Sequence, residues 1–325
     1  MRTSRNNAIL ACIAVLAATG TRGVAAQRYP DHPIRFVVGF SAGGNSDIVA
    51  RLLGQKVSQY VGQPVIVDNR PGAASNIAAE IVAKAPPDGY TILLGSISLA
   101  TNATLYTKLN YDALRDLAAV TQLSVNPYML VIHPSLPVKN VKELIALAKA
   151  KPGYLSYASA GSGSGAHLFA ELFRDMAGIN IVHVPYKGSP PATTDVVSGH
   201  VPMQFDNVIT ALPLAKTGKL RPLAVTTVKR LSIAPDVPTI AETGVPDYNA
   251  NSWFGVFAPA STPKDVIAKL HAEFVKALQT QELRERLLVL GNDPVGSTPE
   301  EYSKFFRAEV AKWASVIKKV GVKVD

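Results

Sequence analysis

The sequence is nearly free of cysteine, since Cys12 is the only one in 325 residues. Cys12 lies in an apolar run from Ala8 to Ala18 that follows two arginines at the N-terminus. This order, with small residues at Val24-Ala25-Ala26, predicts a cleaved secretory signal over residues 1–26. The mature chain would then begin at Gln27 and hold no cysteine, which excludes disulfides and thiol chemistry and fits the bacterial periplasm.

Other absences narrow the function further. The N-terminal apolar run is shorter than the roughly 20 residues that a membrane-spanning helix needs. The six histidines show no metal-ligand spacing, so we expect neither a metal nor a cofactor. The net charge of +9 falls to +6 without residues 1–26 (30 basic against 24 acidic residues), and a positive field favours anionic ligands. The basic residues are scattered, so nucleic acid is not an expected partner.

No catalytic constellation is found. Gly161–Ala166 matches the dinucleotide pattern G-x-G-x-x-A, but no acidic residue follows the next strand to bind a ribose. Gly163 occupies the central position where a G-x-S-x-G hydrolase motif needs serine. We therefore expect no catalytic residues and no enzymatic activity.

Short β-branched runs alternate with helical patterns along most of the chain. Pro64–Val67, Ile77–Ala85 and Thr91–Leu94 show the alternation, which is typical of an α/β fold with a largely parallel sheet. Helical spacing predicts one core-facing side for the helix that follows residue 45. That side comprises Ile48, Leu52, Leu53, Val57 and Tyr60.

Two extended stretches, Val120–His133 and Tyr248–Pro259, resemble crossings between domains. They predict a discontinuous first domain, residues 27–125 and 252–325, and a continuous second domain, residues 126–251. Two crossover strands would join the domains, and ligands favour the cleft of such a hinged protein.

Two glycine- and serine-rich loops of the same design each join a predicted strand to an amphipathic helix. The loops are Phe40-Ser41-Ala42-Gly43-Gly44-Asn45-Ser46-Asp47 and Ser159-Ala160-Gly161-Ser162-Gly163-Ser164-Gly165. Glycine lets backbone N–H groups approach a ligand closely, and the positive end of the following helix points to the same place. One such loop in each half of the chain predicts a small anion held from two sides.

A series of short motifs runs along the chain. The series begins with the first loop and continues through Val67-Asp68-Asn69-Arg70-Pro71-Gly72-Ala73, Pro87-Asp88-Gly89-Tyr90-Thr91, the second loop with His167-Leu168, Val184-Pro185-Tyr186-Lys187-Gly188, Phe205-Asp206-Asn207 and Pro235-Asp236-Val237-Pro238-Thr239. Together these motifs resemble those of one family, the Bug/TctC periplasmic solute-binding receptors associated with tripartite tricarboxylate transporters. The motifs occur in order over almost the whole mature chain, and jointly they are specific.

The resemblance implies a two-lobed periplasmic-binding-protein fold (Venus-flytrap, type II) that holds a carboxylate between the two loops, largely through backbone N–H groups and water. Carried onto this sequence, the implied contacts are Phe40, Ser41, Ala42, Gly43, Gly44, Asn45, Ser159, Gly161, Ser162, Gly163 and Ser164. The family usually has proline where this chain has Ala42, which supplies an N–H group and more freedom.

Several side chains are candidates for the rest of the ligand. Ser96 and Ser98 follow a predicted strand, where a parallel sheet presents its binding edge. Asp206 could receive an amino or hydroxyl group, or only order its loop. The family pattern includes His167, for which a packed position is the alternative, and Tyr186 follows the end of a strand.

These observations predict a periplasmic receptor, a monomer, that closes on a small carboxylate and delivers it to membrane transporter subunits or a sensor kinase. Two alternatives stay open. One is a secreted α/β hydrolase that uses Ser162 or Ser164, and the other is a module that binds only a partner protein such as a sensor.

Overall fold

The computed structural model describes residues 29–321, and the chain forms two units, residues 1–31 and 32–325. Of the first unit, only residues 29–31 are described, and the Tyr29–Pro30 peptide bond there is cis. The predicted signal segment, residues 1–26, lies outside the described residues. None of the helices between residues 29 and 321 has the length and apolar character to cross a membrane.

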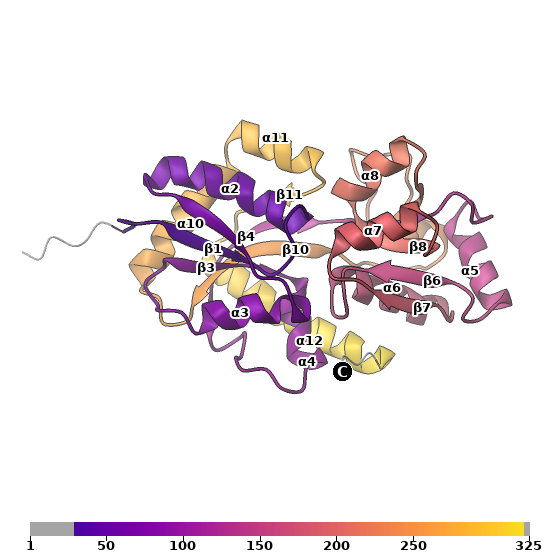
Figure 1. Ribbon diagram of the computed structural model, residues 1–325, viewed down its shortest axis with the longest axis horizontal. Coiled ribbons are helices and arrows are strands. Elements are labelled where there is room, and N and C mark those ends of the chain that lie inside the picture. Colours follow the sequence, from indigo (N-terminus) through magenta and orange to yellow (C-terminus); the bar gives the residue numbers. More distant parts are fainter. Residues whose placement is uncertain (1–28, 322–325) are drawn as a thin grey trace, which may run out of the picture. The chain divides into compact units, whose positions relative to one another are not determined.

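The second unit contains a six-stranded sheet with the order β11-β4-β10-β3-β1-β2 (Figure 1). Its strands are β1 (Ile34–Val38), β2 (Val65–Asn69), β3 (Thr91–Ser96), β4 (Leu117–Asn126), β10 (Ser252–Pro259) and β11 (Asp293–Pro294). β1, β2 and β3 are parallel, whereas β10 pairs antiparallel with both β3 and β4. This sheet and its helices are called the first lobe below.

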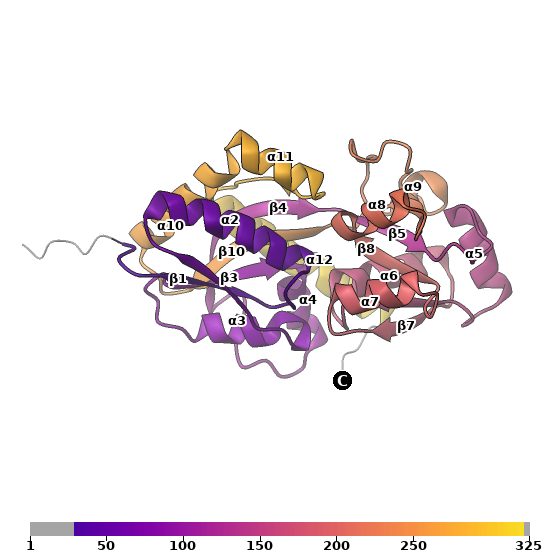
Figure 2. The ribbon, with the colours of Figure 1, turned by 45° about the horizontal axis from the view of Figure 1, so that its top comes forward.

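Helices cover both faces of this sheet. They are α2 (Asn45–Val61), α3 (Asn76–Ala83), α4 (Ile97–Leu105), α10 (Lys264–Leu278), α11 (Gln281–Val289) and α12 (Pro299–Val320), with a short 3₁₀ turn, η2 (Ala73–Ser75). α2 and α10 pack together on one face, and α3, α4 and α12 cover the other (Figures 1 and 2). A capping box fixes the start of α12, since Thr298 accepts from the N–H of Glu301 and the Glu301 carboxylate accepts from the N–H of Thr298.

The second lobe is built on a five-stranded sheet with the order β7-β6-β8-β5-β9. Its strands are β5 (Tyr128–Ile132), β6 (Ser156–Ser159), β7 (Val182–Pro185), β8 (Met203–Asn207) and β9 (Arg221–Val225). Its helices are α5 (Val141–Ala150), α6 (Gly165–Ala177), α7 (Ser189–Val197), α8 (Val208–Lys216) and α9 (Ile240–Thr243). The α/β class predicted from the sequence is confirmed, but the expectation of a largely parallel sheet is wrong. Both sheets are mixed, because β10 and β5 each pair antiparallel with both of their neighbours where the chain passes between the sheets.

The chain crosses from the first sheet to the second between β4 and β5, at Pro127, and returns before β10. A third connection comes from α12, whose later part packs against α6 of the second lobe. There the rings of Trp313 and Phe169 lie 5.8 Å apart, and Lys319 pairs with Asp175 at 2.8 Å. The two lobes are therefore linked by two strands and by a packed helix.

Both glycine loops follow the strand at which the order of their sheet reverses. β1 lies between β2 and β3, and β6 lies between β7 and β8. In each sheet the helix after the central strand and the next crossover helix therefore cover opposite faces, α2 and α3 in the first sheet and α6 and α7 in the second. A crevice opens at such a switch point beyond the carboxyl ends of the strands. The topology thus brings each loop to the edge of its sheet where ligands bind.

The predicted core face of α2 needs a correction. Its buried side is centred on Val49, Leu53 and Val57, whereas Ile48 and Leu52 are only half-buried. The reason is that Ile48 and Leu52 lie on the side of α2 that faces α11, a helix that comes far later in the chain. Local periodicity gives the width of an apolar stripe but does not show which part of it faces the sheet.

Candidate ligand-binding site

A small chamber between the lobes lies at the starts of several helices. In the described part of the chain, five helices have their N-cap residue in its wall: Gly44 (α2), Ser96 (α4), Ser164 (α6), Gly188 (α7) and Asn207 (α8). Four of these caps, all but Ser164, make no side-chain hydrogen bond to their own helix. Because the first N–H groups of a helix lack partners within it, the chamber is surrounded by positive helix ends.

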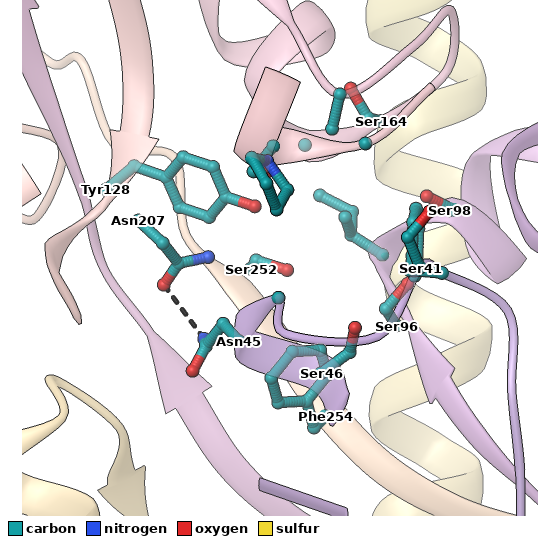
Figure 3. A pocket seen from close by; sticks show the side chains of 18 residues that line it. Ser41, Asn45, Ser46, Ser96, Ser98, Tyr128, Ser164, Asn207, Ser252 and Phe254 are labelled. Carbon is teal, nitrogen blue, oxygen red and sulfur yellow. Dashed lines mark hydrogen bonds between the residues drawn. The ribbon is translucent and has the colours of Figure 1, made fainter. Parts of the chain in front are cut away.

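The chamber has a volume of ≈ 50 Å³ and a polar, uncharged wall. Its hydroxyl and amide side chains are Ser41, Asn45, Ser46, Ser96, Ser98, Tyr128, Ser164, Ser189, Asn207 and Ser252, most of them labelled in Figure 3. No Lys, Arg, His, Asp or Glu among residues 29–321 lines it. Helix ends and neutral donors, rather than ionised side chains, are therefore the groups that an anion would meet in this chamber.

The first loop is held by a side chain four residues further on. Gly43 has a φ of +82°, and its N–H donates to Asp47 Oδ2 at 3.0 Å. Arg51 also donates to Asp47. Burial alone would raise the pKa of Asp47, but the hydrogen bonds from Arg51 and Gly43 outweigh it, so the pKa is lowered and the carboxylate stays ionised. Asp47 thus shapes the loop and lies outside the chamber wall.

The second loop repeats this arrangement with histidine. Gly163 has a φ of +81°, and its N–H donates to His167 Nδ1 at 3.0 Å. The His167 ring stacks on His183 with centroids 4.0 Å apart, and Nε2 of His183 lies 2.6 Å from Oγ of Ser159. Burial lowers the pKa of His167 to about 3 and that of His183 to about 4, so both rings are neutral.

Both loops make hydrogen bonds across the cleft. The Gly163 carbonyl accepts hydrogen bonds from Ser98 Oγ at 3.4 Å and Thr101 Oγ1 at 3.2 Å, both from α4 in the first lobe. Asn45 Nδ2 donates to Asn207 Oδ1 at 2.9 Å, the contact drawn as a dashed line in Figure 3. The structure therefore shows the lobes in direct contact around the chamber.

The structure distributes the predicted site residues over three locations. Those in the wall of the small chamber are Phe40, Ser41, Gly44, Asn45, Ser96, Ser98 and Ser164. Gly161, Ser162 and Tyr186 line a larger, adjoining chamber, together with Phe40 and Ser41. Ala42, Gly43, Ser159, Gly163, His167 and Asp206 line neither chamber.

Asp206 is fully enclosed behind the wall. Its carboxylate accepts hydrogen bonds from Thr193 Oγ1 at 2.9 Å and from the N–H of Asn207 at 2.8 Å. Burial raises the pKa of Asp206 to about 6, and the hydrogen bonds it accepts offset only part of this effect. These contacts fix the end of β8, where Asn207 reaches the chamber.

Several lining residues were absent from the predicted set, including Ser46, Tyr128, Ser189 and Ser252. Ser46 and Ser189 each stand in the first turn of a helix, a signal that could have found them. Tyr128 and Ser252 flank the two crossings between the sheets, and only the folded chain brings them to the chamber.

Two sheets joined by crossing strands, with a polar chamber between the lobes, define a two-lobed solute-binding protein of the periplasmic-binding-protein fold. Residues 49–322 match the family described as the tripartite tricarboxylate transporter family receptor, TctC. The chain belongs to this Bug/TctC family, as its motifs predicted. It is a family of solute-binding receptors and not of enzymes, so the hydrolase alternative is set aside.

Individual relatives cover nearly the whole chain. Protein BugT of Bordetella pertussis is 38% identical over 97% of this chain and 98% of its own. The structure of R. palustris Rpa4515 with adipate has a TM-score of 0.88 and 39% identity, covering 91% of this chain and 99% of that one. MatC from Rhodopseudomonas palustris with bound malate has a TM-score of 0.84 and 31% identity, over 89% of this chain and 100% of that one.

Proposed function

We propose that this protein is a periplasmic receptor that captures a small carboxylate between its lobes and delivers it to a tripartite tricarboxylate-type transporter or a sensor. The observation that carries the proposal is the chamber at which five described helices begin, and to whose wall residues 29–321 contribute no ionised side chain. A carboxylate there accepts hydrogen bonds from backbone N–H groups, serine hydroxyls and amides, and it meets no opposing charge.

Capture is a shift between open and closed arrangements of the lobes. We propose that residues 27–125 and 252–325 move as one body and residues 126–251 as the other. A ligand that contacts both lobes binds the closed arrangement more tightly, and it shifts the population by that difference in affinity. The interlobe contacts of Gly163 and Asn45 form in the same arrangement.

Relatives support the ligand class, because adipate and malate, each bound to a solved family structure, are both carboxylates. We propose in addition that residues 1–26 direct export and are removed, so that the receptor works in the periplasm as a monomer. Protein recovered from the periplasm should then begin at Gln27, as mass spectrometry of the intact chain would show.

The test of the receptor function is a thermal-shift screen of protein that has been unfolded and refolded to remove bound ligand. Mono-, di- and tricarboxylates, amino acids and aromatic acids form the panel. A ligand at 100 times its Kd stabilises the folded state by about 2.7 kcal/mol, which raises Tm measurably. A stabilising acid supports the receptor, whereas a panel without any hit contradicts it and favours a module that binds only a protein partner.

A further inference from the structure

A second chamber, larger than the first, lies between the lobes. Its volume is ≈ 570 Å³, and it is lined mainly by glycine, alanine, proline and aromatic residues from both lobes. The two chambers share Phe40, Ser41, Ala160 and Gly188 in their walls, so they adjoin each other. The smaller one is called the inner chamber and the larger one the outer chamber below.

The sizes of the two chambers imply a division of roles. The inner chamber, at ≈ 50 Å³, holds a group of only a few heavy atoms, such as a carboxylate. Pockets for whole small molecules usually have volumes of about 300–1,000 Å³, a range that includes the outer chamber. A ligand larger than a few heavy atoms that places its carboxylate in the inner chamber needs further space, and the outer chamber is the adjoining space of sufficient volume.

The outer wall suits an apolar group. Tyr106 from the first lobe and Tyr186 from the second both line it. The Tyr186 hydroxyl donates to Asp195 at 2.6 Å, and burial together with this bond raises the pKa of Tyr186 to about 12, so the ring stays neutral. Among the described residues, Lys187 is the one charged residue in this wall.

One side of the outer chamber is formed by a turn with an unusual backbone. Ala73, Ala74 and Ser75 have φ values of +45°, +50° and +77°, a region that L-amino acids rarely adopt. Asn102 Nδ2 donates to the Ala74 carbonyl at 2.8 Å and helps to hold the turn. Such backbone outliers persist only where the surrounding structure enforces them, and they concentrate at functional sites. Here the turn presents small alanine side chains, which leave the chamber open.

We propose that the outer chamber binds the apolar body of the ligand, so that the preferred substrate is a carboxylate carrying an alkyl chain of several carbons or an aromatic ring. This inference rests on the proposed function, because it takes the inner chamber as the carboxylate site. Closure of the lobes brings the Tyr106 and Tyr186 walls around the apolar body, which is then removed from water.

The test is calorimetric titration of ligand-free protein with straight-chain monocarboxylates from acetate to octanoate, and with benzoate. Burial of each methylene should increase affinity about fourfold, which is the fold-change equivalent of about 0.8 kcal/mol, until the chamber is filled. Tyr186→Ala should reduce this gain per methylene, while Tyr186→Phe, which keeps the ring and removes only the hydroxyl, should retain it.

A second variant covers the case in which Tyr186→Ala does not fold. Ala73→Asn places a polar amide at an exposed position that lines only the outer chamber, and Asn tolerates the positive φ of Ala73. This variant should reduce the gain in affinity per methylene, as Tyr186→Ala should. If acids bind with affinity independent of chain length, the inference is wrong and the proposed function stands. If no acid of this series binds while a dicarboxylate, a tricarboxylate or an amino acid of the receptor panel does, the inference is wrong and the proposed function stands. If no acid of either set binds, the proposed function itself fails.

Discussion

The backbone N–H of Gly163 donates a hydrogen bond to Nδ1 of His167, one turn into the helix that follows. The N–H of Gly43 donates to Asp47 at the same spacing in the first lobe, and both bonds measure 3.0 Å. Each loop is therefore closed by its own helix, with an ionised acceptor in one lobe and a neutral acceptor in the other. Loop shape is set before a ligand arrives, which reduces the ordering that binding would otherwise require.

Replacement of His167 tests this closure. His167→Ala leaves the buried N–H of Gly163 without its acceptor, and we expect a loss of about 1–3 kcal/mol in unfolding free energy and a weaker ligand affinity. His167→Asn should recover much of both, because Asn Oδ1 stands about as far along the side chain as His Nδ1. Urea unfolding and calorimetry on the two variants make the comparison. If His167→Asn is no more stable and binds ligand no more tightly than His167→Ala, the hydrogen bond does not hold the loop in its binding shape.

Three glycines in the loops should respond differently to alanine. Gly44 has a φ of −79°, so Gly44→Ala causes no backbone strain and costs only the lower preference for alanine at the N-cap of α2. Gly43 has a φ of +82° with open space around it, so Gly43→Ala should cost about 1 kcal/mol of stability. A Cβ on Gly163 would lie 3.0 Å from Leu105 Cδ1 and 3.2 Å from Asn102 Oδ1, both in the first lobe.

Gly163→Ala therefore obstructs the closed arrangement in addition to straining the backbone. We expect its stability without ligand to match that of Gly43→Ala, while its ligand affinity falls further. Thermal unfolding and calorimetric titration separate the two effects. Equal affinity in the two variants would mean that closure does not bring Gly163 against Leu105 and Asn102.

The neutral histidines predict a pH dependence of stability. In the folded state the pKa of His167 is about 3 and that of His183 about 4, below the ordinary 6.5, so the unfolded chain binds more protons below pH 6.5. Their contribution is fully present above pH 6.5 and is lost as pH falls toward 4, by about 1.4 kcal/mol per pH unit for each ring.

Asp206 opposes this trend. Its pKa of about 6 lies above the ordinary 3.8, so its contribution is present below pH 3.8 and is lost as pH rises through 6. Asp206→Asn should therefore steepen the loss of stability between pH 6 and pH 4, and His167→Asn should flatten it. Urea unfolding at pH 4.5, 5.5 and 7.0 measures the slopes. Parallel slopes in the wild-type protein and both variants would disprove this assignment of protons.

The hydrogen bond between the side-chain amides of Asn45 and Asn207 should slow ligand release. Asn207→Ala removes one interlobe hydrogen bond, worth about 1 kcal/mol, and should weaken affinity about fivefold, chiefly through faster dissociation. Stopped-flow fluorescence can follow release. The fluorophore for this measurement is Trp253, which lies between the lining residues Ser252 and Phe254. Its indole N–H donates to Glu309, as does the indole N–H of Trp313.

Asn292→Ala is the matched control for this measurement. Asn292 pairs with Asn45 inside the first lobe, so its loss should lower stability and leave the dissociation rate near that of the wild-type protein. Equal acceleration in both variants would contradict a specific role for the interlobe bond.

The sequence is sufficient to predict the α/β class, the two loops and the serines at the end of β3. Each of these depends on local patterns together with one general rule, that the carboxyl ends of parallel strands meet at a common edge. Ser96 and Ser98 reach the chamber for that reason. The family followed from motifs that are distinctive only in combination.

The remaining features depend on contacts between segments distant in the chain. The side of α2 that faces the core was misplaced because α11 covers the other side. By contrast, one feature that the sequence did not predict is local: the N–H groups of Gly43 and Gly163 donate to Asp47 and His167, each only four residues further along the chain. Tyr128 and Ser252 reach the chamber only when both crossings are in place.

The central claim is that converging helix ends select a carboxylate. Its most direct test is calorimetric titration of ligand-free protein with the best acid from the screen and with the matching primary amide, which has the same shape and no charge. The account predicts that the acid binds at least tenfold more tightly, because positive helix ends stabilise the anion and a buried site screens them little. Equal affinity for acid and amide would contradict it.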